Sequence, residues 1–238
     1  MLGFGNSEMG VAGAPGATPP AAGSDLFVLY NKSTDNSIAD RSPFARPITM
    51  TGSISLDGST PAWPGTKRMM WPTANNNWLS APHDDRLYLT TPAWTIDVKF
   101  WLPNSAAGRT NILVNKRYNA WPNTGWSMHI DSNGFLVWEI GVNNEGMTSA
   151  TAISYNTEMF ASVVKKDGVL GLHLQGAPVG NKAYTAAITG DSCPLYIGVN
   201  GWQDGGSSPA GGNITGVRIN DTVARYTPGA AYTPPTSF

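Results

Sequence analysis

The sequence contains few charged residues: 15 Lys and Arg stand against 16 Asp and Glu among 238 residues, which leaves a formal net charge of −1. Nucleic acids and anionic membranes attract strongly basic proteins, so we expect neither as a partner. No stretch of about 18 consecutive apolar residues is present, so no membrane-spanning helix is expected. The first residues lack the basic and apolar regions of a signal peptide, which predicts synthesis in the cytoplasm without export.

Cysteine is nearly absent as well, and Cys193 is the only one. An internal disulfide is therefore excluded, and the fold must be stabilised by packing. We predict that Cys193 is a small buried apolar side chain, because no cluster of Cys or His accompanies it. Phosphate-binding loops and dinucleotide-binding glycine motifs are also missing. Apolar residues, by contrast, make up 41% of the chain and include nine Trp, enough for one large core.

Helical periodicity is missing too, and from residue 25 onward the pattern is one of short β-strands separated by turns. In the clearest strand, Trp94, Ile96, Val98 and Phe100 alternate with polar residues, so we predict that these four side chains share one buried face. Many antiparallel strands joined by short turns predict a single all-β sandwich or jelly roll over residues 25–238.

Turn residues place several of these strands. Further strands are predicted over residues 125–130, 135–142, 160–165 and 169–174. In the turn from Asp131 to Gly134 we expect the Asn-Gly pair to supply the positive φ angles of a tight hairpin. Similar turns are predicted at residues 166–168 and 175–178. The longest stretches without a strand pattern, residues 115–124, 201–212 and 59–66, are predicted to be loops, where binding sites are often built.

Residues 1–24 are rich in Gly, Ala and Pro and show no strand or helix period. We interpret them as an extended assembly arm that docks on a neighbouring protein. Its sizeable apolar residues, Leu2, Phe4, Met9 and Val11, are expected to fill pockets on that neighbour. The alternative is a short ordered tail packed on its own domain.

Six segments carry a resemblance to a known family: ITGVRI at 214–219, VARYT at 223–227, YTPPT at 232–236, PLYIG at 194–198, WTIDVKFW at 94–101 and GW at 125–126. They resemble segments of laminin-G-like, concanavalin A-like domains of bacteriophage and prophage proteins. The resemblance spans roughly residues 25–238 and implies a concanavalin A-like jelly-roll β-sandwich. The roles that it implies are carbohydrate binding, adhesion and virion decoration.

Glycoside hydrolysis is the first enzymatic activity to consider on such a fold, and a retaining enzyme needs two carboxylates about 5 Å apart. Glu139 has no second acid two or four residues away along its predicted strand. Ser127, His129 and Asp131 share one strand face, but a catalytic triad requires groups that converge from different segments. We therefore expect no enzymatic activity and interpret these three residues as a polar outer face.

No metal site is expected, and calcium at loop oxygen atoms is the alternative that lectin-like sandwiches suggest. The best candidate ligands are His83-Asp84-Asp85 and Asp204. Adjacent acidic residues more often form a solvated turn, so we predict no cofactor.

Two tryptophans stand in predicted loops beside polar residues, whereas Trp94 and Trp126 fall in strand patterns and are predicted to be core. The candidate contact residues are Arg117, Tyr118, Asn119, Trp121, Trp202 and Asp204. Sugars stack their C–H faces on Trp while Asn, Asp and Arg bind the hydroxyl groups. Three uses of these loops are open: contact with a protein, contact with a sugar, and packing within the domain.

The function expected from these observations is that of a bacteriophage virion protein, capsid or tail associated. It would be attached to other virion proteins through the arm and would display the sandwich. The alternative is a receptor-recognition module that binds a cell-surface glycan, and a glycoside hydrolase is the least favoured. A homo-oligomer is a further possible assembly.

Overall fold

The structure is a computed structural model that describes residues 25–32, 34, 37–59, 65–72, 76–117, 125–141, 146–186, 188, 192–199 and 211–238. Leu2, Phe4, Met9 and Val11 of the expected arm lie outside the described residues. Over the described part the chain is almost entirely β, with two 3-10 helices, η1 (Asp85–Tyr88) and η2 (Asn104–Ala106). No helix in this part is long and apolar enough to cross a membrane.

The described strands pair into two antiparallel sheets. One sheet has the order β14-β13-β12-β7-β16-β1-β5-β4, with β2 beside β1. Its strands are β1 (Phe27–Lys32), β2 (Ala39–Asp40), β4 (Ser55–Asp57), β5 (Thr66–Met70), β7 (Trp94–Trp101), β12 (Glu158–Lys166), β13 (Val169–Leu174), β14 (Ala177–Ala183) and β16 (Asn213–Asn220). The other has the order β11-β10-β9-β8-β15-β6-β3. Its strands are β3 (Thr49–Thr51), β6 (Trp78–Ala81), β8 (Asn111–Arg117), β9 (Gly125–Ile130), β10 (Phe135–Ile140), β11 (Met147–Ala152) and β15 (Leu195–Ile197).

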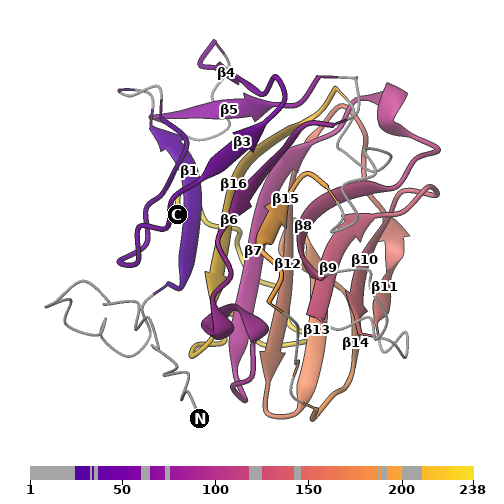
Figure 1. Ribbon diagram of the computed structural model, residues 1–238. Coiled ribbons are helices and arrows are strands. Elements are labelled where there is room, and N and C mark those ends of the chain that lie inside the picture. The colour runs from indigo at the N-terminus through magenta and orange to yellow at the C-terminus, as the bar shows by residue number, and fades with distance from the viewer. Residues whose placement is uncertain are drawn as a thin grey trace, which may run out of the picture.

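The two sheets pack face to face as a jelly-roll β-sandwich, which confirms the predicted fold class (Figure 1). The first and last described strands are neighbours, because β1 pairs with β16 from Phe27 opposite Ile219 to Tyr30 opposite Gly216. Strands β8 to β11 form a run of consecutive antiparallel neighbours at one end of the seven-stranded sheet. Residues that alternate along these four strands therefore meet across them.

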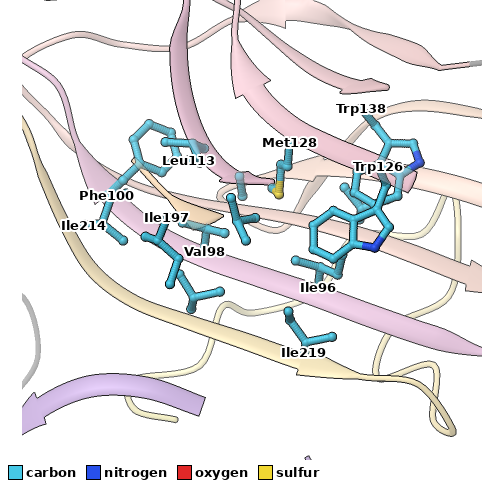
Figure 2. Packing of buried hydrophobic residues seen from close by; sticks show 14 of the residues in the cluster. Ile96, Val98, Phe100, Leu113, Trp126, Met128, Trp138, Ile197, Ile214 and Ile219 are labelled. Carbon is cyan, nitrogen blue, oxygen red and sulfur yellow. The ribbon is translucent and has the colours of Figure 1, made fainter. Parts of the chain in front are cut away.

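The core lies between the sheets, and it is built from alternating residues of both (Figure 2). Trp94, Ile96, Val98 and Phe100 of β7 are all 0% exposed, which confirms the predicted buried face. Three tryptophans meet in the middle: the Trp94 and Trp138 rings lie 5.5 Å apart, and the Trp126 and Trp138 rings lie 5.3 Å apart. Aromatic contacts at such distances add to the stability gained from burial alone.

The turns match the predicted positions but differ in detail. Between β9 and β10 only Gly134 has a positive φ, of 85°, so the expectation that Asn133 would share this conformation is wrong. The turn is held by the Asp131 carboxylate, which accepts hydrogen bonds from the backbone N–H groups of Asn133 and Phe135. The predicted four-residue turn at 175–178 is also shorter than expected. Ala177 already pairs with Leu174 across the hairpin, so β14 begins there.

The outer face of the nine-stranded sheet is covered by the C-terminal segment, residues 221–238. Thr95 and Asp97, which point away from the core, are 1% and 0% exposed. Thr95 Oγ1 donates to the Val223 carbonyl and accepts from the Arg225 N–H. Beyond it, the Tyr226 and Tyr232 rings stack with their centres 3.6 Å apart. This face of the sandwich is therefore occupied by the chain itself.

Candidate functional site

A cleft of about 310 Å³ lies on β9, β10 and β11 of the seven-stranded sheet. The described residues that line it are His129, Val137, Trp138, Glu139, Gly146, Met147 and Thr148. Trp138 alternates with Val137 and Glu139 along β10 and is fully buried in the core. Val137 and Glu139 therefore face away from the core, into the cleft.

The strand register brings three of these side chains into one row. Val137 lies opposite His129 on β9 and opposite Thr148 on β11. Cross-strand partners of this kind have Cβ atoms roughly 4.5–5.5 Å apart, so neighbouring side chains can contact a single small ligand. Val137 supplies an apolar surface between an imidazole and a hydroxyl group. This combination of an apolar wall with a few convergent polar groups is typical of ligand sites.

Glu139 stands in the next row, opposite Ser127, and is ion-paired with Arg117. The Arg117 and Glu139 side chains approach to 2.6 Å and are 17% and 28% exposed. Arg117 reaches Glu139 across β9, where its own cross-strand partner is Gly125. Gly125 has a φ of +92°, and a Cβ atom there would lie 2.0 Å from the Lys116 carbonyl oxygen. The position thus requires glycine, because a side chain there would collide with the backbone of β8.

The electrostatics of the cleft are set by one acid and one neutral imidazole. Burial lowers the pKa of His129, and the positive charge of Arg117 lowers it further. The negative charges of Glu139 and Asp131 act in the opposite direction and raise it. His129 is therefore neutral near pH 7 and can both donate and accept a hydrogen bond. Glu139 gives one oxygen to Arg117 and can accept a further hydrogen bond from a ligand.

A catalytic triad is not assembled from Ser127, His129 and Asp131. Ser127 Oγ lies 3.5 Å from His129 Nδ1, too far for the strong hydrogen bond that a nucleophile and its base make. The Asp131 carboxylate is engaged with the backbone of its own turn. On the predicted polar face, Ser127 is nevertheless only 4% exposed, whereas His129 and Asp131 are partly exposed.

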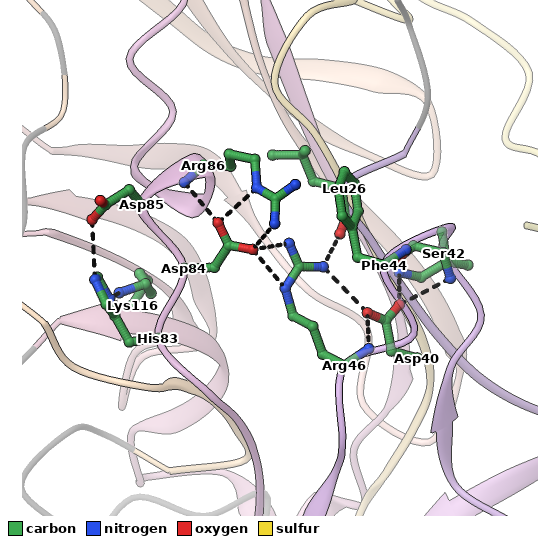
Figure 3. A network of polar contacts seen from close by, with 11 residues as sticks. Leu26, Asp40, Ser42, Phe44, Arg46, His83, Asp84, Asp85, Arg86 and Lys116 are labelled. Atoms are coloured by element: carbon green, nitrogen blue, oxygen red, sulfur yellow. Dashed lines mark hydrogen bonds and ion pairs between the residues drawn. The ribbon is translucent and has the colours of Figure 1, made fainter. Parts of the chain in front are cut away.

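A second polar cluster joins residues of β2, the following loop and η1 (Figure 3). Arg46, only 7% exposed, forms ion pairs with Asp40 and Asp84 and donates to the Leu26 carbonyl. Arg86 also pairs with Asp84, at 2.6 Å. Burial would raise the pKa of Asp84, but hydrogen bonds from Arg86 and Arg46 outweigh it and hold the pKa well below its usual range.

This cluster corrects the calcium alternative. Asp84 was expected either to bind a cation or to be solvated, but its carboxylate is occupied by two guanidinium groups and its side chain is 14% exposed. Asp85 is 86% exposed and contacts His83 Nε2 at 3.0 Å. Within the described residues no group of three or more His, Cys, Asp or Glu side chains is placed to hold a metal ion. Asp204 lies outside them.

Lys116 is fully buried, which its sequence position did not predict. Its ammonium group donates to the Cys193 carbonyl at 2.6 Å, lies 3.1 Å from His83 Nδ1 and stands over the Tyr88 ring. Cys193 is 5% exposed, which confirms the prediction of a buried side chain. Lys116 thus joins the end of β8 to the segment before β15.

Of the candidate contact residues, only Arg117 is described. It was predicted to stand in a loop, but it closes β8, because strand pairing continues from Asn111 to Arg117. Tyr118, Asn119, Trp121, Trp202 and Asp204 lie outside the described residues. The cleft residues Val137 and Thr148 were not predicted. The only sequence feature that could have indicated them is that each alternates along its strand with residues that face the core.

Comparison with known proteins connects the chain to one structural group. No protein-family model matches the sequence, and no curated protein does. The binding domain of Paraclostridial Mosquitocidal Protein 1 superposes with a TM-score of 0.66 at 15% identity, over 85% of this chain and 50% of that one. For the binding domain of botulinum neurotoxin serotype D the TM-score is 0.63 at 13% identity, over 84% and 49%. For that of botulinum neurotoxin DC in complex with SialylT it is 0.60 at 15% identity, over 84% and 48%.

These likenesses establish a shared β-sandwich fold. The chain spans about half the length of the solved chains that it matches. A ligand of a whole binding domain can therefore belong to the half that has no counterpart here. The resemblance to phage laminin-G-like domains gains no support from the family comparison.

Proposed function

We propose that the chain is a carbohydrate-binding recognition module and that the cleft on β9 to β11 is its binding site. The observation that carries the proposal is the row of His129, Val137 and Thr148 beside Glu139, in a cleft of about 310 Å³. That volume is at the small end of the range for ligand sites and suits one or two sugar rings. Support also comes from the structural neighbours, which are binding domains of toxins, one of them in complex with SialylT.

The chemistry of the row is suited to a sugar ring. Val137 offers apolar surface to the C–H groups of one ring face. Neutral His129, the Thr148 hydroxyl and the Glu139 carboxylate can accept hydrogen bonds from hydroxyl groups, and the first two can also donate. Because the opposite sheet is covered by residues 221–238, the seven-stranded sheet offers the accessible face for a ligand.

A glycan array followed by calorimetry tests the proposal. Loss of one hydrogen bond is worth about 0.5–1.5 kcal/mol, so Thr148→Val and His129→Ala should each weaken sugar binding about two- to tenfold. Thr151→Val, on the same strand but outside the cleft lining, is the matched control and should bind normally. Sugar binding that is equally strong in all three variants would place the site elsewhere. Silence on a broad array would count against carbohydrate as the ligand.

We further propose that binding occurs without turnover. Glu139 is the acid among the described lining residues, and hydrolysis with retention requires a second carboxylate about 5 Å away. A reducing-sugar assay with β-glucans and with any bound glycan is expected to show no product. Hydrolysis that disappears in Glu139→Gln would contradict this.

The virion role is the second candidate, and it is supported by the phage-like sequence segments and by the composition of residues 1–24. In it, the binding module would be displayed on a capsid or tail, and the arm would attach it to other virion proteins. Deletion of residues 2–23 should leave the melting temperature nearly unchanged while abolishing incorporation into the particle. Normal incorporation of the truncated protein would show that the arm is not the attachment.

A protein receptor is a third candidate, since another neighbour, the botulinum neurotoxin DC binding domain, is in complex with rat synaptotagmin II.

A further inference from the structure

We infer that the cleft selects uncharged, hydroxyl-rich sugars and rejects sugars that carry a carboxylate. This inference rests on the proposed function and adds the chemical class of the ligand. It comes from the way in which the charges around the cleft are already paired.

The charged group that faces the cleft among its described lining residues is the Glu139 carboxylate. Arg117 already pairs with Glu139 at 2.6 Å, and because the two opposite charges offset each other, the pair offers a ligand acid little net positive charge. A ligand carboxylate that entered the cleft would face a like charge in a partly dehydrated space. Like charges brought together in an interface weaken binding, by at least about tenfold.

A cation that contacts the lining residue Gly146 is also engaged. Lys182 of β14 donates its ammonium group to the Gly146 carbonyl at 3.0 Å, so that its charge lies against the backbone. The chain segments that connect these strands, residues 118–124 and 142–145, contain no Lys or Arg. The second of them contains an acid, Glu145. The local sequence therefore supplies no additional cation to recognise an acidic sugar.

A neutral sugar meets a matched set of groups instead. Its hydroxyl groups can donate to the free oxygen of Glu139 and exchange hydrogen bonds with neutral His129 and with Thr148. The ion pair with Arg117 orients the Glu139 carboxylate, whose oxygens are strong hydrogen-bond acceptors. Arg117 is thus a positioning residue for this acceptor, and it gives the site a latent anion-binding group.

The experiment compares matched neutral and acidic sugars on the same array. The probes are galactosides with and without a terminal sialic acid, and manno-oligosaccharides with and without oxidation of their primary hydroxyl groups to carboxylates. We expect each acidic probe to bind the wild-type protein at least about tenfold more weakly than its neutral partner. Added salt should reduce this difference, because it screens the repulsion.

The Glu139→Gln variant gives the sharper test. It removes the negative charge and frees Arg117, so it should weaken neutral probes and strengthen acidic ones, which reverses the order of affinity. Glu158→Gln is the matched control: Glu158 is also paired with an arginine, Arg68, at 2.6 Å, and is 26% exposed, but it belongs to the other sheet. This control should leave the preference unchanged.

The outcomes separate the two proposals. Acidic probes that bind the wild-type protein as tightly as neutral ones, with binding weakened in Thr148→Val, would overturn the inference and leave the carbohydrate site in place. An unchanged preference in Glu139→Gln would also overturn it. Absence of sugar binding to the cleft would overturn the proposed function and the inference together.

Discussion

The tryptophan cluster between the sheets gives a prediction whose size can be worked out from the structure. Trp94 is 0% exposed and its ring lies 5.5 Å from that of Trp138. Truncation of a buried Trp to Ala removes its burial and leaves a cavity, so Trp94→Ala should lower the free energy of unfolding by about 3–5 kcal/mol. For a domain whose total stability is roughly 5–15 kcal/mol, this is a large fraction.

A comparison of two Trp→Phe variants separates packing from hydrogen bonding. Trp126 Nε1 donates to the Leu87 carbonyl at 2.9 Å, whereas Trp94 Nε1 has no partner among the described residues. Both variants lose similar volume, but only Trp126→Phe leaves a buried carbonyl without its donor. Trp126→Phe should therefore be more destabilising than Trp94→Phe, by about 1–3 kcal/mol.

Urea unfolding followed by far-ultraviolet circular dichroism measures these differences without relying on tryptophan fluorescence. Equal m-values across the variants would show that the midpoint shifts report stability. A loss below about 1.5 kcal/mol for Trp94→Ala would refute the reasoning, since it would mean that the site collapses or admits water. Equal stability of the two Phe variants would refute the role of the Leu87 carbonyl.

Three further predictions test the backbone, an ion pair and a buried histidine. Gly125→Ala should destabilise the protein by at least about 1–3 kcal/mol, because residue 125 has a positive φ and a Cβ atom there would clash with a carbonyl group. Gly65→Ala is the control and should cost less, since Gly65 also has a positive φ, of +75°, but has open space around it. Equal falls in melting temperature for the two variants would contradict this. Arg46→Ala should cost about 3–5 kcal/mol because it leaves the buried Asp40 carboxylate without its cation, and removal of the more exposed Arg225 should cost under about 1 kcal/mol, as chemical denaturation can show. Burial lowers the pKa of His173, so its contribution to stability is present above the unfolded pKa of about 6.5 and is lost as the pH falls through the folded value. The stability of His173→Phe relative to wild type should therefore improve between about pH 7 and pH 5, and a pH-independent difference would refute this.

The core of the sandwich could be predicted from sequence because its signal is local. Strict alternation from Trp94 to Phe100 identifies a strand and its buried face, and the glycine-containing turns divide the chain into hairpins. What local patterns cannot give is the partner of each strand. Arg117 was assigned to a loop because the residues around it resemble a turn, and only its pairing opposite Gly125 shows that β8 continues to this point.

The cleft depends on which strands pair and in which register, and local sequence patterns do not show this. His129, Val137 and Thr148 are separated in sequence by a hairpin and by a longer connection, and the register alone brings them into one row. A shift of one residue in β10 would turn Val137 and Glu139 into the core and expose Trp138. The burial of Trp138 against Trp94 and Trp126 therefore fixes the register on the inner face, and the same register determines which groups meet on the outer face.

This coupling has a consequence for how the site can change. The inner face of β9 and β10 sets stability and register, while the outer face contributes His129, Val137 and Glu139, which are not members of the hydrophobic core cluster. Substitutions on the outer face can thus alter the charge or shape of the cleft at little cost to the fold, since surface changes away from buried partners usually cost less than about 0.5 kcal/mol. Glu139 is the exception, because its loss leaves Arg117 unpaired. The ion pair is therefore the point at which ligand preference and local structure are linked, and it is where a change from neutral to acidic ligands would begin.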